Sequence, residues 1–168
     1  MIETMSAVPE LPVKPVHRIA KELMASTGFL LAKLGLDFKG KAVERLAQAG
    51  YEVYDYSLLA ILAEGAHQAQ ATVADTLGVD PSRLVALLDS LEERSLVVRE
   101  RDPHDRRRHV VSITPTGKRE LARIRDMVRK LEDEYLSGLD AASREALHGV
   151  LQRLAMQHDP RCGPAATD

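Results

Sequence analysis

The chain has 168 residues, of which 45% are apolar and 29% charged, so it is long and apolar enough to bury a core. Aromatic residues make up only 4% and Trp is absent, which predicts an aliphatic core. The single cysteine, Cys162, excludes an internal disulfide framework. No apolar run approaches the roughly 20 residues of a membrane span, and no signal-peptide pattern opens the chain, so we expect a cytoplasmic protein without membrane contact.

The net charge of −2 is unevenly spread along the chain. The segment from Val97 to Arg119 holds seven Lys or Arg and three Asp or Glu, a local charge of +4 that leaves −6 elsewhere. A basic segment in an acidic protein predicts a local contact with a polyanion rather than general adhesion to one.

The first half of the chain predicts helices. Helical apolar spacing begins after Pro15 and continues to about residue 50, weakened by Gly35 and Gly40, which indicates one long kinked helix or two in tandem. The stretch "DYSLLAILAEG" predicts the next helix, closed by Gly65.

A compact helix pair follows. "ATVADTLG" predicts a short helix that ends at Gly78, and "VDPSRLVALLDSLEERS" restarts two residues later. Asp80 is suited to the N-cap because its carboxylate can accept from free N–H groups of the first turn, and Pro81 suits the position after it. Two helices joined by a tight turn with Gly are typical of a helix-turn-helix.

The basic segment lies in a predicted β-hairpin. "LVVRER" and "HVVSIT" are short and β-branched, and they flank "DPHDRRR", whose Pro and Asp residues favour a turn. A helix-turn-helix followed by a basic hairpin predicts a winged helix that binds double-stranded DNA. Arginines at the wing tip, Arg106, Arg107 and Arg108, suit a narrow minor groove or the phosphate backbone. The alternative is a solvated turn without a ligand.

The second helix of the pair presents a polar face opposite its leucine stripe. We expect this helix to enter a major groove, with Arg83 as the base-reading candidate because a guanidinium matches guanine O6 and N7. The alternative for Arg83 is an ion pair with Glu92, Glu93 or another acid. The predicted DNA-contacting residues of the helix are Ser82, Arg83, Ala86 and Ser90.

Two helices close the chain. Thr114 and Pro115 predict the start of a long helix that runs to about Gly138, with an apolar seam at alternating spacings of three and four residues. A last helix begins near Asp140 and carries a second apolar stripe. The two stripes predict a stable C₂ homodimer with an interface above about 2,000 Å². The predicted interface residues are Leu121, Ile124, Val128, Leu131, Leu147, Val150 and Leu154.

The stretch from Ala71 to Leu121 resembles the DNA-binding core of the MarR (multiple-antibiotic-resistance regulator) family. The similarity rests on the Leu-Gly turn, "LEERSLVVRE", "DPHDRR" and "ITPTG", with Ser95 where the family commonly has Gly. The resemblance implies a homodimeric transcriptional regulator on a pseudo-palindromic operator, most simply a repressor, with the family's wing arginine at Arg107. It also implies a cleft for a small aromatic or phenolic anion whose binding releases DNA.

The expected fold is mainly α with a small β-hairpin wing, a winged helix-turn-helix with long N- and C-terminal dimerisation helices. We expect one domain over residues 1–168. Within it, residues 16–50 and 117–157 form the dimerisation helices, residues 54–114 form the DNA-binding lobe, and residues 1–14 and 158–168 are flexible ends.

No motif in the sequence identifies an effector, so its binding residues are predicted from side-chain chemistry alone. Cationic or protonatable groups near phenol rings suit an aromatic acid or a phenol, and the candidates are His17, Arg18, Lys21, Tyr54 and Tyr56. The same residues could simply be surface or interface groups. Redox sensing by Cys162 is one alternative. Metal sensing with His158 and Cys162 as a first pair of ligands is another, although the sequence offers no second pair to complete a zinc site.

No cofactor is expected, and the sequence lacks the common catalytic motifs: a Walker loop, a dinucleotide-binding G-x-G-x-x-G, H-E-x-x-H and G-x-S-x-G. We therefore expect a protein that is not an enzyme. A winged helix used for contact with another protein is the remaining alternative, and the arginine-rich wing argues against it.

Overall fold

The computed structural model describes residues 18–65, 68–101 and 109–163. The chain forms two compact units, residues 1–37 and 38–168. The expectation of a single domain over residues 1–168 stays a prediction.

Of the two predicted alternatives for the first 50 residues, the structure has two helices in tandem. They are α1 (Lys21–Met24) and α2 (Thr27–Gln48). The break comes at Ser26, whose hydroxyl oxygen accepts a hydrogen bond from the N–H of Phe29 at 3.2 Å. This is the bond of a helix N-cap, so α2 starts anew after Ser26. Gly35 and Gly40 lie inside α2 without interrupting it.

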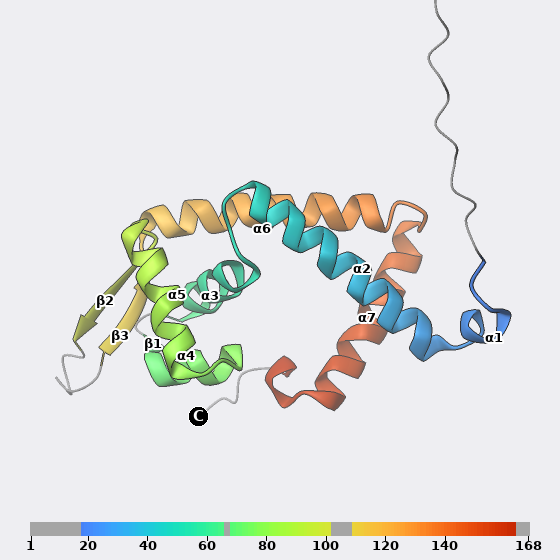
Figure 1. Cartoon of the computed structure of the whole chain (residues 1–168), viewed down its shortest axis with the longest axis horizontal. Helices are drawn as coiled ribbons and strands as arrows, with labels where there is room; N and C mark the ends of the chain where they lie inside the picture. The colour runs from blue at the N-terminus through green and yellow to red at the C-terminus, as the bar shows by residue number, and fades with distance from the viewer. Residues whose placement is uncertain (1–17, 66–67, 102–108, 164–168) are drawn as a thin grey trace, which may run out of the picture. The chain divides into compact units, whose positions relative to one another are not determined.

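The winged helix forms within the second unit. Its elements are α3 (Val53–Glu64), β1 (Gln68–Ala69), α4 (Gln70–Leu77), α5 (Pro81–Glu93), β2 (Val97–Arg101) and β3 (His109–Ile113). The strands form an antiparallel sheet in the order β1-β3-β2, with Gln68 and Arg99 both opposite Val111. The predicted hairpin and helix pair are confirmed (Figure 1). The strand β1 was not predicted, because two residues carry no readable alternation.

Local chemistry explains where the helices of the pair end and begin. Gly78 ends α4 in the left-handed conformation, with φ of 66°, which a glycine adopts without steric cost. The Asp80 carboxylate accepts from the N–H of Arg83 at 3.0 Å, and Pro81 opens α5. Ser95 also has a positive φ, of 58°, in the turn between α5 and β2. The glycine that the family resemblance expects at this position therefore has a conformational reason.

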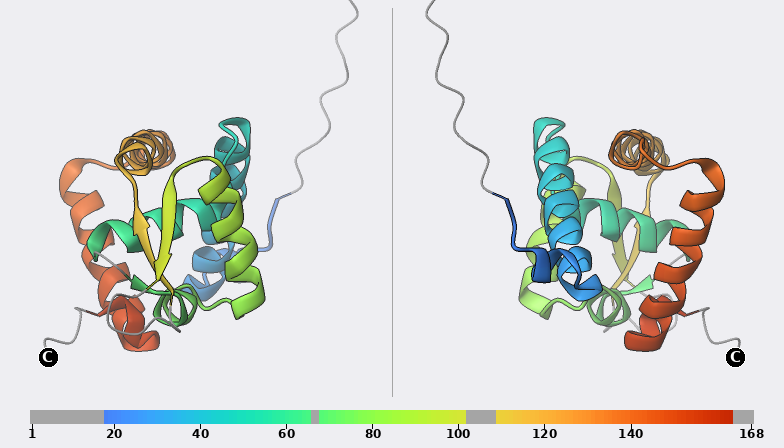
Figure 2. Two further views of the ribbon diagram at one scale, coloured as in Figure 1. Left: turned by 90° about the vertical axis from the view of Figure 1, so that its left-hand side faces the viewer. Right: turned by 90° about the vertical axis from the view of Figure 1, so that its right-hand side faces the viewer.

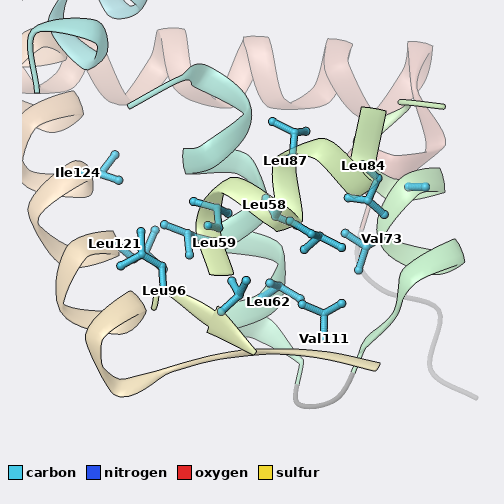
Figure 3. Close-up of a cluster of buried hydrophobic side chains, with 14 of the residues drawn as sticks. Leu58, Leu59, Leu62, Val73, Leu84, Leu87, Leu96, Val111, Leu121 and Ile124 are labelled. Atoms are coloured by element: carbon cyan, nitrogen blue, oxygen red, sulfur yellow. The ribbon is translucent and has the colours of Figure 1, made fainter. Parts of the chain in front are cut away.

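The core is aliphatic, as predicted, and α3 lies at its centre. Figure 3 shows leucine and valine side chains from α3, α4, α5, β3 and α6 converging on one another. Each such buried side chain stabilises the fold by about 1.5–3 kcal/mol relative to an exposed one. The fully buried members include Leu58, Leu59, Leu62, Val73, Leu84, Leu88, Leu91, Val111, Leu121 and Ile124.

The sheet and the helices share this core. The helix α5 packs against β2 and α3 packs against β3, while the first part of α6 (Pro115–Tyr135) covers α3. Figure 2 (left) shows β2 and β3 side by side with α5 along one side of the hairpin. This packing turns the leucine stripe of α5 inward and leaves the other face of the helix exposed.

The long helix α6 begins as expected, and most of its apolar seam is buried within the single chain. Thr114 caps it by accepting from the N–H of Gly117 at 2.9 Å. However, Leu121 and Ile124 are only 2% and 0% exposed within the single chain, and Leu131 is buried as well. Because α3 packs on α6, Leu121 and Ile124 belong to the core of the second unit. These three side chains offer almost no area to a second copy, and Val128 is already half-buried against the same core.

The last helix, α7 (Ala141–His158), begins at the predicted cap, where Asp140 accepts from the N–H of Ser143 at 2.8 Å. None of its residues is buried, and the predicted interface residues Leu147, Val150 and Leu154 are 37%, 44% and 41% exposed. A short 3-10 helix, Pro160–Cys162, follows, so regular structure continues into the first residues of the expected flexible end. No helix among the described residues is long and apolar enough to span a membrane.

The start of α6 packs closely against Leu96, just before β2, and against Ile113 of β3, and this packing can be tested by a stability measurement. A methyl group at Gly117 would collide with the carbonyl oxygen of Leu96 and lie 2.8 Å from Cγ1 of Ile113. We expect Gly117→Ala to lower the free energy of unfolding by about 1–3 kcal/mol or more, because backbone must move to admit the methyl group. Gly138→Ala is the control, since nothing lies within 4 Å of its added carbon. Equal thermal unfolding midpoints of the two variants would contradict this packing.

Candidate nucleic-acid interface

The exposed face of α5 carries the four residues predicted to contact DNA. Ser82, Arg83, Ala86 and Ser90 are all exposed, while the leucines of the opposite face are buried. Ser82 donates its hydroxyl to the Asp80 carboxylate, which strengthens the helix cap. This bond and the N–H of Arg83 hold the pKa of Asp80 below its ordinary value. The start of α5 is therefore fixed by its own side chains.

Val85 is a further exposed residue of this helix, 43% accessible and off the leucine stripe. Val85 is not among the residues predicted to contact DNA, although its position outside the leucine stripe indicates an exposed side chain. An exposed aliphatic side chain beside Ala86 provides the kind of surface that contacts a thymine methyl group.

Arg83 stacks on an aromatic ring instead of forming the ion pair considered as its alternative. Its guanidinium carbon lies 4.4 Å from the centre of the Tyr54 ring. No carboxylate of the described residues forms a salt bridge with it, and Glu92 bonds Arg99 instead. A cation–π contact orients the guanidinium while leaving its N–H groups available for a ligand.

A hollow of about 320 Å³ opens beside this arginine, between α5 and the segment from Gly50 to Asp55 at the start of α3. The hollow extends from the exposed face of α5 to Asp55 and Arg94, which lie at the C-terminal end of that helix. Its lining consists of Gly50, Glu52, Asp55, Arg83, Ala86, Leu87, Ser90 and Arg94.

A polar network anchors the C-terminal end of α5 next to this hollow. Asp55 is 4% exposed, accepts from the N–H of Glu52 at 2.9 Å, and pairs with Arg94 at 3.4 Å. The Arg94 guanidinium lies 4.4 Å from the centre of the Tyr51 ring. The Tyr51 hydroxyl in turn donates to Glu120 of α6 at 2.7 Å.

This network joins α3, the end of α5 and α6 through charged and aromatic groups. Burial, and then the hydrogen bond to Glu120, raise the pKa of Tyr51 above its ordinary value, so the phenol remains a donor at neutral pH. None of these residues was predicted from the sequence to have a role. Only the capping pair of Glu52 and Asp55 left a readable signal, because the other contacts join positions far apart in the chain.

The hairpin brings Arg101 and His109 opposite each other at the end from which residues 102–108 connect the two strands, and both are exposed. The wing arginines Arg106, Arg107 and Arg108 lie outside the described residues, so their role stays a prediction.

The residues predicted to bind an effector fall into both units. Arg18 and Lys21 belong to the first, and both are exposed, whereas Tyr54 and Tyr56 of α3 belong to the second and pack against its core. His17 lies outside the described residues. Cys162 is exposed, and among the described side chains no three His, Cys, Asp or Glu gather as metal ligands would.

Comparison with known proteins identifies the family. A family model described as the MarR family matches residues 53–108. A protein of Thauera aromatica, named as a transcriptional regulatory protein for the hcr operon, is 36% identical over 102 residues. That match covers 61% of this chain and 61% of the relative, less than two thirds of its length.

Solved structures match over more of the chain. A MarR-family transcriptional regulator from Rhodococcus sp. RHA1 is 34% identical, with a TM-score of 0.69 over 82% of this chain and 98% of that one. CouR from Rhodococcus jostii RHA1, bound to p-coumaroyl-CoA, is 32% identical, with a TM-score of 0.66 over 89% and 100%. The repressor CouR bound to a 23-mer DNA duplex is 31% identical, with a TM-score of 0.72 over 83% and 99%.

These relatives are transcriptional regulators, which confirms the expectation that the protein is not an enzyme. The winged helix, the helix pair and the hairpin agree with the fold that the sequence predicted. The chain therefore belongs to the MarR family of transcriptional regulators.

Proposed function

We propose that this protein is a sequence-specific DNA-binding repressor that acts in the cytoplasm as a homodimer on a pseudo-palindromic operator. The observation that carries the proposal is the exposed face of α5, where Arg83 is oriented by Tyr54 and unpaired with any described carboxylate. The DNA duplex bound to CouR supports the same use of this fold. A protein-contact role for the winged helix would leave the protein without salt-sensitive duplex binding.

In this proposal each part of the interface has a separate task. The helix α5 enters the major groove, where Arg83 reads a guanine and Val85 and Ala86 contact thymine methyl groups. Ser82 and Ser90 donate to phosphates or base edges. The wing arginines Arg106, Arg107 and Arg108 neutralise phosphates or enter the minor groove, where a narrow groove concentrates negative potential.

The division between reading and anchoring can be measured with single variants. We expect Arg83→Ala to relax preference at one base position by about 1–3 kcal/mol, because a bidentate contact to guanine is lost. Arg107→Ala should weaken binding to all duplexes and lower the slope of log K against log salt by about one. Arg129→Ala, which alters an exposed pair with Asp126 on α6, is the control. Titration against an operator selected from random duplexes and its point-mutated series checks both, and a uniform loss for Arg83→Ala would contradict base reading.

The homodimer proposal rests on α7. The side chains of its apolar stripe, Leu147, Val150 and Leu154, are each more than one third exposed. The core residues are buried without any contribution from α7. A second copy with C₂ symmetry would cover this stripe and place two α5 helices on one face of a duplex. The stripe of α6 contributes little, because its leucines are buried within the chain.

Charge placed on the stripe should therefore dissociate the dimer. We expect Leu147→Glu combined with Leu154→Glu to yield a folded monomer at micromolar concentration, because two carboxylates would be buried without partners. Gln152→Glu adds the same kind of charge at an exposed polar position of α7 and should leave the dimer intact. Sedimentation velocity measures the state of each variant, and a double variant that sediments as the wild type does would contradict this interface.

We further propose that a small aromatic or phenolic ligand controls DNA release, with His17, Arg18, Lys21, Tyr54 and Tyr56 as the candidate binding residues. The p-coumaroyl-CoA bound to CouR supports a phenolic acyl group as one form of this ligand. Redox control through the exposed Cys162 is the alternative, and metal control the less supported one.

Linkage sets the size of the expected effect. A ligand that weakens DNA binding 100-fold must bind the DNA-free protein about 2.7 kcal/mol more tightly than the DNA complex. Calorimetric titration with salicylate, benzoate and p-coumaroyl-CoA, with and without operator, should reveal this difference for at least one compound. A compound that binds equally in both titrations is no inducer. DNA release by peroxide that Cys162→Ser abolishes, with no binding of the aromatic compounds, would replace this proposal with redox control.

A further inference from the structure

The helix proposed to enter the DNA groove is itself acidic. Between Pro81 and Glu93 it carries one arginine, Arg83, and three carboxylates, Asp89, Glu92 and Glu93. Asp89 lies three residues after Ala86 and is half exposed, close to the proposed reading face. Phosphates within about one Debye length, near 10 Å at 0.1 M salt, would repel these carboxylates.

Arg99 of the strand β2 contacts two of the three carboxylates at once. Its Nη2 lies 2.6 Å from Oδ1 of Asp89 and 2.5 Å from Oε2 of Glu92, and its Nε donates to the same Glu92 oxygen at 2.8 Å. The backbone N–H of Arg99 also donates to Oε1 of Glu92 at 3.1 Å. With 24% of its side chain exposed, Arg99 is the most enclosed member of this cluster.

The cluster joins the two parts of the proposed interface. Asp89 and Glu92 lie on α5, and Arg99 lies on the first strand of the wing, opposite Val111 of β3. The hydrogen bonds from Arg99 hold the pKa of Glu92 below its ordinary value, so this carboxylate stays charged and bonded at neutral pH. A planar guanidinium can bridge two carboxylates in this way, whereas an ammonium cannot match the fork.

We propose that Arg99 is a positioning residue of the DNA interface, which neutralises the acidic side of α5 and fixes the wing against it without contacting DNA. The inference rests on the proposed DNA-binding function. Under this inference Arg83 and Arg107 bind DNA, whereas Arg99 reduces the electrostatic repulsion between α5 and the phosphates.

Four variants of the full chain test this role by measuring affinity and salt dependence on the operator. Arg99→Gln should weaken binding about tenfold at 0.1 M salt, since two carboxylates then face the phosphates uncompensated. Combining it with Asp89→Asn and Glu92→Gln should restore affinity to within about threefold of the wild type. Asp89→Asn with Glu92→Gln alone should bind at least as tightly as the wild type. Arg99→Lys should fall between the wild type and Arg99→Gln.

The outcomes separate the competing roles. If Arg99 instead contacts a phosphate, the triple variant stays weak and the salt slope falls by about one in every variant that lacks the arginine. Unchanged affinity of Arg99→Gln overturns the inference while leaving the proposed function intact. A wild-type protein that binds no duplex overturns the proposed function, and this inference with it. Thermal unfolding of all variants identifies a loss of folding, and Arg99→Lys keeps the comparison available should Arg99→Gln not fold.

Discussion

Burial of the α3 leucines is the interaction on which the other features of the second unit depend. Leu58, Leu59 and Leu62 are almost completely inaccessible and contact side chains from α4, α5, the sheet and α6. Every neighbouring element turns its apolar stripe toward α3. The polar face of each of these elements is therefore directed outward. The exposed face of α5 is therefore a consequence of how the core packs. Packing of the leucine stripe fixes the direction in which the four polar or small residues of the opposite face point.

Polar contacts then set the orientation of α5 more finely than the core can. Asp80 fixes its first turn, Arg94 ties its end to Asp55 and Tyr51, and Arg99 joins its side to the wing. Aliphatic packing is nondirectional, whereas hydrogen-bonded ion pairs require particular distances and angles. The core packs only against the leucine stripe of α5. On the rest of this acidic helix, the Asp80 cap and the contacts of Arg94 and Arg99 therefore fix its position.

The two terminal helices illustrate the difference between a stripe that a chain hides by itself and one that it leaves open. The stripe of α6 looks in sequence like a coiled-coil seam, yet Leu121 and Ile124 pack into the core beside α3. The stripe of α7 is shorter and less regular, but it remains exposed along its length. Periodicity states only that a face is apolar. Which partner covers that face depends on the neighbours that the fold brings to it.

The sequence by itself determined the elements whose signals are local. The cap at Asp80 with Pro81, the helix end at Gly78, the Thr114 cap and the two β-branched wing strands are all encoded within a few residues, and each appears where it was predicted. The leucine stripe likewise identified the exposed face of α5, and the motifs of the winged helix identified the family. Only the tertiary structure decided the contacts between distant positions: Arg83 on the Tyr54 ring, Arg94 between Asp55 and Tyr51, Tyr51 on Glu120, and the burial of the α6 seam. Such contacts depend on how helices and strands pack in three dimensions, and a charge or a ring in the sequence does not specify which distant group it will meet.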